Sequence, residues 1–116
     1  MSVIIYHNPR CTKSRQTLQL LEDKGLQIEV IEYLKTPPTA HELKEIISKL
    51  GITPRQLLRN KEAEFKAHGL DDLSLSDEAI IAAMVRVPKL IERPIVLANG
   101  KAAIGRPPEA ALAILE

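Results

Sequence analysis

The sequence predicts an α/β protein built on a mixed four-stranded sheet, and three observations lead to this class. A strand–helix–strand pattern opens the chain, two apolar runs joined by Asn99-Gly100 stand near its end, and the helical patterns of an insertion lie between them, at residues 36–88. Strands joined by a helical crossover run parallel, whereas Asn-Gly between apolar runs is typical of a two-residue antiparallel hairpin. The sheet is therefore expected to mix both strand directions.

The opening unit begins with Val3–His7, a β-branched and aromatic run that predicts a buried strand and is ended by Asn8-Pro9. A helix is expected over Ser14–Lys24, with Gly25 as its stop. Gln27–Leu34 begins with alternating apolar and polar residues, which fits a second strand. These elements form the first half of the expected sheet.

The middle segment carries two capping boxes, Thr39 with Glu42 and Thr53 with Gln56. In a capping box, two side chains satisfy backbone N–H groups that are free at the start of a helix. A helix is therefore expected after each threonine. Asn60–Ser74 is polar and is expected to form loop and turn.

The last third of the chain predicts a helix from Ser76 to Pro88, strands over Pro94–Ala98 and Lys101–Ile104, and a final helix opened by Gly105-Arg106-Pro107-Pro108. The resulting order is β-α-β, a helical insertion, then β-β-α. This order is that of a thioredoxin-like domain. We expect a single domain, because the insertion is too short and too weakly apolar to hold a core of its own.

Composition narrows the classes of function. Residues 1–116 suffice for one compact domain. The net charge of +1 gives no strong field for nucleic acid or an anionic membrane, and no apolar run approaches the roughly 20 residues that span a bilayer. The start Met1-Ser2 lacks the basic flank of a signal peptide. We expect a cytoplasmic monomer, with neither nucleic acid nor membrane as a partner.

Cys11 is the only cysteine in the sequence, which excludes an internal disulfide and a C-x-x-C pair. Three histidines, His7, His41 and His68, have no ligand-like spacing, so no metal site is expected. Cys11 stands between the first strand and the first helix, where free backbone N–H groups and the helix dipole favour thiolate. The alternative is that Cys11 is a small buried hydrophobic residue.

Four short motifs lie at the boundaries of the expected elements. They are His7-Asn8-Pro9-x-Cys11-x-x-Ser14, Leu57-Leu58-Arg59, Ile91-x-Arg93-Pro94-Ile95-Val96 and Gly105-Arg106-Pro107. Each motif alone is weak. In this order, and at these boundaries, the sequence resembles the glutaredoxin-coupled arsenate reductase family over essentially its whole length.

This resemblance implies an arsenate reductase in which Cys11 is the nucleophile, Arg59, Arg93 and Arg106 surround the oxyanion, and Pro94 is a cis-proline facing the thiol. It further implies arsenate as substrate, glutathione as co-substrate, glutaredoxin as the recycling partner, and no tightly bound cofactor. Elementary chemistry points the same way, because guanidinium groups bind tetrahedral oxyanions through paired hydrogen bonds and also stabilise a thiolate.

The individual residues leave alternatives open. Arg59 also fits the solvated face of a short helix. His7 either helps to activate Cys11 or only closes the first strand. Ser14 either hydrogen-bonds the sulfur or caps the helix. We take His7 and Ser14 as candidate residues for supporting the thiolate.

Two departures from the family pattern fit a short housekeeping branch. Thr12-Lys13 replaces the Gly-Thr pair common after the cysteine, and the sequence ends at Glu116 without a C-terminal extension. Two other functions stay open. One is a regulator of the Spx type that binds RNA polymerase, although Ser14 replaces the second cysteine of its switch. The other is a monothiol, glutathione-dependent oxidoreductase that acts on mixed disulfides.

Overall fold

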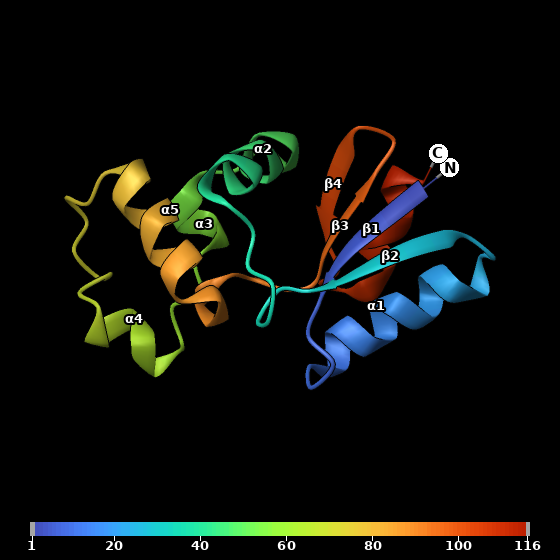
Figure 1. Ribbon diagram of the computed structural model, residues 1–116, viewed down its shortest axis with the longest axis horizontal. Helices are drawn as coiled ribbons and strands as arrows, with labels where there is room; N and C mark the ends of the chain where they lie inside the picture. Colours follow the sequence, from blue (N-terminus) through green and yellow to red (C-terminus); the bar gives the residue numbers. More distant parts are fainter. Residues whose placement is uncertain (1, 116) are drawn as a thin grey trace. The chain divides into compact units, whose positions relative to one another are not determined.

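A mixed four-stranded sheet is built from strands near both ends of the chain (Figure 1). The computed structural model describes residues 2–115. The strands are β1 Ser2–His7, β2 Gln27–Glu32, β3 Ile95–Ala98 and β4 Lys101–Ile104, in the spatial order β2-β1-β3-β4. β1 runs parallel to β2 and antiparallel to β3, and β3 runs antiparallel to β4. The thioredoxin-like sheet expected from the sequence is confirmed.

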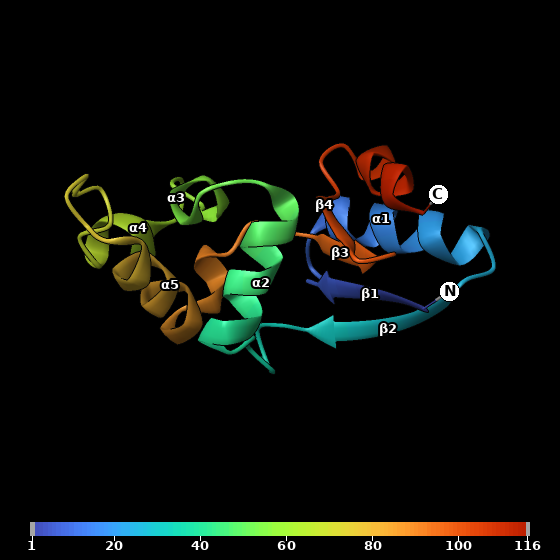
Figure 2. The same ribbon diagram turned by 90° about the horizontal axis from the view of Figure 1, so that it is seen from above.

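Two helices cover one face of this sheet (Figure 2). They are α1 (Thr12–Asp23) and the 3-10 helix η2 (Pro108–Ile114), which pack against each other. The apolar core between helices and sheet consists of Val3, Ile5, Leu21, Val96, Ala98, Ala111 and Ile114. Burial of these side chains holds α1, and with it the start of α1, against β1.

The hairpin between β3 and β4 turns at Asn99 and Gly100, whose φ angles are 55° and 71°. Positive φ at both central residues is the conformation of a type I′ turn, which Asn-Gly adopts readily. The antiparallel hairpin predicted from Asn99-Gly100 is therefore confirmed. The hairpin therefore places the end of β4 beside the start of β3.

Residues 37–92 contain helical elements joined by loops. Their elements are α2 Ala40–Leu50, α3 Pro54–Leu57, α4 Ala63–Ala67, α5 Asp77–Arg86 and the 3-10 helix η1 Pro88–Leu90. Both predicted capping boxes are present, at the starts of α2 and α3. None of the helices within residues 2–115 combines the length and the apolar character that crossing a membrane requires.

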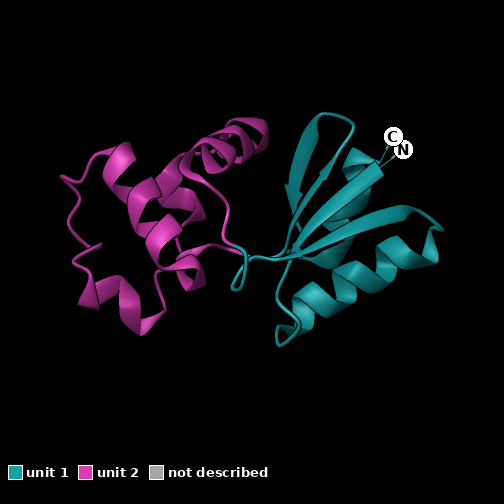
Figure 3. Ribbon diagram, viewed as in Figure 1, with its two compact units in different colours: residues 1–36, 93–116 teal, residues 37–92 magenta. Residues whose placement is uncertain are grey.

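The chain divides into two compact units (Figure 3). One unit contains residues 1–36 and 93–116, and the other contains residues 37–92. The sheet, α1 and η2 belong to the first unit, and the five short helical elements belong to the second. The expectation that both form a single domain stays a prediction.

Two elements differ from expectation. A short helix, α4, lies within the segment Asn60–Ser74 that was expected as loop. It buries no residue and has no side-chain cap, so it leaves no pattern in the sequence. The last helix is of the 3-10 type rather than α, as in the bond from the Ala110 N–H to Pro107 O.

Candidate active site

Cys11 stands at the junction of β1 and α1. It is the N-cap residue of α1, which begins at Thr12 rather than at the expected Ser14, and only 9% of its surface is exposed. The Cys11 N–H donates to Asn8 O at 3.0 Å, and Cys11 O accepts the Arg15 N–H at 3.0 Å. These bonds fix the backbone on both sides of the thiol.

The hydroxyl of Ser14 joins α1 to the end of β1. It lies 2.6 Å from His7 Nδ1 and accepts the Asn8 N–H at 3.0 Å. Ser14 is itself fully buried. Its side chain therefore contacts His7 and Asn8, while the capping position of α1 is held by Cys11. The alternative that Ser14 caps the helix is wrong.

His7 is buried beneath the Cys11 loop, with 7% of its surface exposed. Burial lowers the pKa of its imidazole, because a desolvated imidazolium is unfavourable. The carboxylate of Glu32 raises this pKa and the guanidinium of Arg15 lowers it, but burial dominates. His7 is therefore a neutral imidazole at neutral pH, hydrogen-bonded to Ser14.

The register of the sheet brings three segments of the chain together at the same end of the strands. Tyr6 pairs with Ile95, and Ile95 pairs with Ile104. The end of β1, the start of β3 and the end of β4 therefore lie side by side. Directly beyond them are the loop that carries Cys11, the Arg93-Pro94 pair and the Gly105-Arg106 pair.

Arg106 contacts the sulfur directly. Its Nη2 lies 3.8 Å from Cys11 Sγ, and its Nε donates to Arg93 O at 2.9 Å. One guanidinium thus connects the thiol to the backbone just before Pro94. The peptide bonds Arg93–Pro94 and Arg106–Pro107 are both cis. The structure brings Cys11, Arg93, Pro94 and Arg106 into one cluster.

The pKa of the Cys11 thiol lies below its ordinary value. Burial raises it, but the backbone N–H of Ser14, the charges of Arg93 and Arg106 and the backbone N–H of Lys13 together lower it by more. The Cys11 side chain accepts no capping hydrogen bond of ordinary geometry, so the N–H groups at the start of α1 act on the sulfur as partial charges. The thiolate fraction at neutral pH is therefore larger than that of a free cysteine.

Thr17 and Gly105, which the sequence did not identify as site residues, hold α1 against the Arg106 loop. The buried Thr17 hydroxyl donates to Lys13 O at 2.8 Å and lies 3.5 Å from Gly105 O. A Cβ at Gly105 would collide with the Thr17 hydroxyl and lie 2.8 Å from Pro94 Cγ. Glycine permits this close backbone approach. The glycine directly before Arg106-Pro107 is therefore the sequence feature that indicates the contact between α1 and the Arg106 loop.

Arg59 belongs to the other unit, residues 37–92. It follows α3, and its N–H donates to Leu90 O at 2.8 Å. Its Nη2 lies 2.7 Å from Glu62 Oε1, and the two side chains are only 18% and 17% exposed. Lys89 Nζ lies 3.6 Å from the other oxygen of Glu62. The interpretation of Arg59 as a residue on a solvated helix face is therefore wrong.

The site supplies a stabilised thiolate with two guanidinium groups beside it. This arrangement can carry out nucleophilic attack on an electrophile that bears negative charge. Within residues 2–115, no group of three or more His, Cys, Asp or Glu side chains is placed to hold a metal ion. Fold and site together define a thioredoxin-like protein with one activated cysteine at the start of its first helix.

Comparison with known proteins gives the family. The model of the ArsC family matches residues 6–114, and the chain belongs to the ArsC family. An arsenate reductase of Neisseria meningitidis serogroup B is 52% identical over 112 residues, which cover 96% of each chain. The Escherichia coli protein YfgD, described as uncharacterized, is 56% identical over 114 residues, 97% of this chain and 96% of that protein. The solved structure of an arsenate reductase from Vibrio cholerae matches with a TM-score of 0.96 and 54% identity, covering 99% of this chain and 98% of that one.

Proposed function

We propose that this protein is an arsenate reductase in which the Cys11 thiolate attacks the arsenic atom of arsenate. The observation that carries the proposal is the 3.8 Å contact between Arg106 Nη2 and Cys11 Sγ. Arsenate is an anion, so a thiolate must approach it against like charge, and a permanent cation beside the sulfur offsets this repulsion. Membership in the ArsC family and about 50% identity to proteins named arsenate reductase support this choice of substrate.

In the proposed complex, Arg93 and Arg106 hold arsenate oxygens through charge-assisted hydrogen bonds, and the free N–H groups at the start of α1 add neutral donors. Each charge-assisted bond contributes about 1.5–3 kcal/mol. Arg59 is the third candidate ligand. The Arg59 guanidinium is paired with the Glu62 carboxylate. Arg59 must therefore release this carboxylate before it can bind arsenate.

The electrons for the reaction come from external thiols, because Cys11 is the only cysteine. Attack by Cys11 forms a sulfur–arsenic bond, and one arsenate oxygen leaves as water. Two external thiols then give up two electrons and two protons and become a disulfide. Arsenic passes from the pentavalent to the trivalent state, the sulfur–arsenic bond breaks, and arsenite and free Cys11 are released. We propose glutathione as the thiol, glutaredoxin as the partner that recycles it, and a monomer in the cytoplasm as the working form.

Formation of arsenite tests this proposal. Wild-type protein supplied with arsenate, glutathione and glutaredoxin is expected to form arsenite, and Cys11→Ser is expected to form none above background. Lys101→Gln, at an exposed position on β4, is the control that should keep full activity. Absence of arsenite with the wild type, or undiminished arsenite with Cys11→Ser, would refute the proposal.

The same assay separates the proposal from the function of a monothiol oxidoreductase. That function also uses the Cys11 thiolate, but its substrate is a glutathione mixed disulfide. If the wild-type protein deglutathionylates a peptide and forms no arsenite, this result would refute the proposed activity and support the function of a monothiol oxidoreductase.

A further inference from the structure

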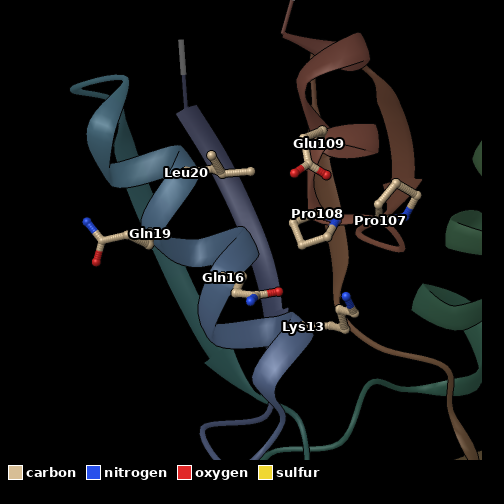
Figure 4. Close-up of a pocket in the computed structure, with 7 residues that line it drawn as sticks. All are labelled: Lys13, Gln16, Gln19, Leu20, Pro107, Pro108 and Glu109. Carbon is tan, nitrogen blue, oxygen red and sulfur yellow. The ribbon is translucent and has the colours of Figure 1, made fainter.

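A groove lies between α1 and η2 and has no assigned function. We call it the α1–η2 groove; its volume is about 540 Å³, and its walls include Lys13, Gln16, Leu20, Pro107, Pro108 and Glu109. Figure 4 shows Lys13, Gln16 and Leu20 projecting from α1 toward Pro108 and Glu109, whereas Gln19 points away. The volume falls within the roughly 300–1,000 Å³ that is usual for small-molecule sites.

Both walls of the groove begin beside the thiol. Lys13 follows Cys11 by two residues, in the first turn of α1. Pro107 directly follows Arg106, whose Nη2 contacts Cys11 Sγ at 3.8 Å. A ligand in the α1–η2 groove would therefore have one end close to the reacting sulfur.

The charges of the groove indicate the kind of ligand. Lys13 and Glu109 are exposed residues of opposite charge, and neither is in an ion pair with another residue of the described range 2–115. A second pocket, of about 200 Å³, lies on the β2 side of the Cys11 loop and is lined in part by Glu32 and Lys35. There the two charges are paired with each other at 3.5 Å. The α1–η2 groove thus offers both signs of charge to a ligand.

We propose that the α1–η2 groove binds the zwitterionic thiol tripeptide glutathione, with Lys13 at a carboxylate and Glu109 at the α-ammonium group; this inference rests on the proposed function. Leu20 follows Lys13 by seven residues along the helix, a rise of about 10 Å, and an extended tripeptide spans about the same length. Gln16 offers an amide to the peptide groups, and the half-buried Leu20 offers apolar surface. A simple anion would be repelled by Glu109, and an uncharged thiol would use neither charge.

Titration with S-methylglutathione, which has no free thiol and cannot react, tests the groove separately from turnover. In an NMR titration of the wild type, the backbone amides of residues 13–20 and of Glu109 are expected to shift. Glu109→Gln is expected to raise the Kd for S-methylglutathione about twofold to fivefold, as for an exposed ion pair. It should not change the Kd for the N-acetyl derivative, which lacks the ammonium group. Lys13→Gln should raise both Kd values.

The controls are Glu29→Gln on β2 and Lys101→Gln on β4, which remove exposed charges elsewhere on the sheet and should leave both Kd values unchanged. Shifts at residues 7–10 and 32–35 instead would assign the ligand to the second pocket and overturn the inference. Arsenite formation with glutathione, without any shift in the groove, would also overturn it while the proposed function stands. Groove binding by a protein that forms no arsenite would support the groove and refute the proposed function.

Discussion

Replacement of Arg106 by glutamine is expected to raise the pKa of the Cys11 thiol, because it removes a cation that contacts the sulfur. Arg106 Nη2 lies 3.8 Å from Cys11 Sγ. Two unit charges at that separation attract by about 1 kcal/mol in water and by about 4 kcal/mol at an effective dielectric constant near 20. Because Arg106 is exposed to solvent, the lower part of this range applies. Loss of about 1.4 kcal/mol of thiolate stabilisation lowers the ratio of thiolate to thiol at a given pH about tenfold.

The rate of Cys11 alkylation by iodoacetamide, measured as a function of pH, tests this prediction, because the thiolate is the reacting species. Cys11 is the only cysteine, so the rate reports on a single site. Arg106→Lys keeps the charge but loses the planar group whose Nε donates to Arg93 O, and it should retain most of the lowered pKa. Arg10→Gln removes an exposed cation from the same loop and is the matched control.

An unchanged pKa in Arg106→Gln would refute the electrostatic reasoning. An equal rise in Arg106→Lys would show that the hydrogen bond to Arg93 O, rather than the charge, supports the thiolate. An equal rise in Arg10→Gln would show that the net charge of the loop matters and the 3.8 Å contact does not.

Three further predictions concern packing, pH and the Arg59 ion pair. Gly105→Ala should lower the free energy of unfolding by about 1–3 kcal/mol, because the added methyl group overpacks against α1; an unchanged urea midpoint would contradict this. Burial lowers the pKa of His7, so the unfolded chain takes up this proton at higher pH than the folded protein, and stability should fall as the pH drops below 6.5. His7→Gln should remove that part of the slope in pH-dependent unfolding, and an unchanged slope would refute this assignment. Glu62→Gln should lower the free energy of unfolding by about 1–3 kcal/mol, because it leaves the guanidinium of Arg59, which is only 18% exposed, without its carboxylate; an unchanged urea midpoint would show that this ion pair does not stabilise the fold.

Elements with local signals could be predicted from the sequence, and elements without them could not. The capping box of α2 closes as predicted, with the Glu42 N–H donating to Thr39 Oγ1 at 3.1 Å and the Thr39 N–H donating to Glu42 Oε1 at 2.9 Å. These partners are three residues apart, so the pattern is complete in a short stretch of sequence. The helix α4 has neither a capping side chain nor a buried face, and no such pattern marks it.

Ser14 illustrates the limit of local patterns within the site. Its position near the start of a helix suggested a cap or a contact with the sulfur, and both ideas consider only its own helix. In the structure, its hydroxyl turns back to His7, on the preceding strand. That contact depends on the packing of α1 against β1, which requires the core beneath the helix to be in place.

The arginines depend on the register of the sheet in the same way. Cys11 and Arg106 are 95 residues apart, so no local pattern contains both. They meet because Tyr6 pairs with Ile95 and Ile95 pairs with Ile104. A slip of one residue in either pairing would turn the side chains of that strand to the opposite face and displace the segment that follows β4. The motifs identify which arginines are candidates, but the two strand pairings decide whether a guanidinium reaches the sulfur. Only a charge that reaches the sulfur can lower its pKa.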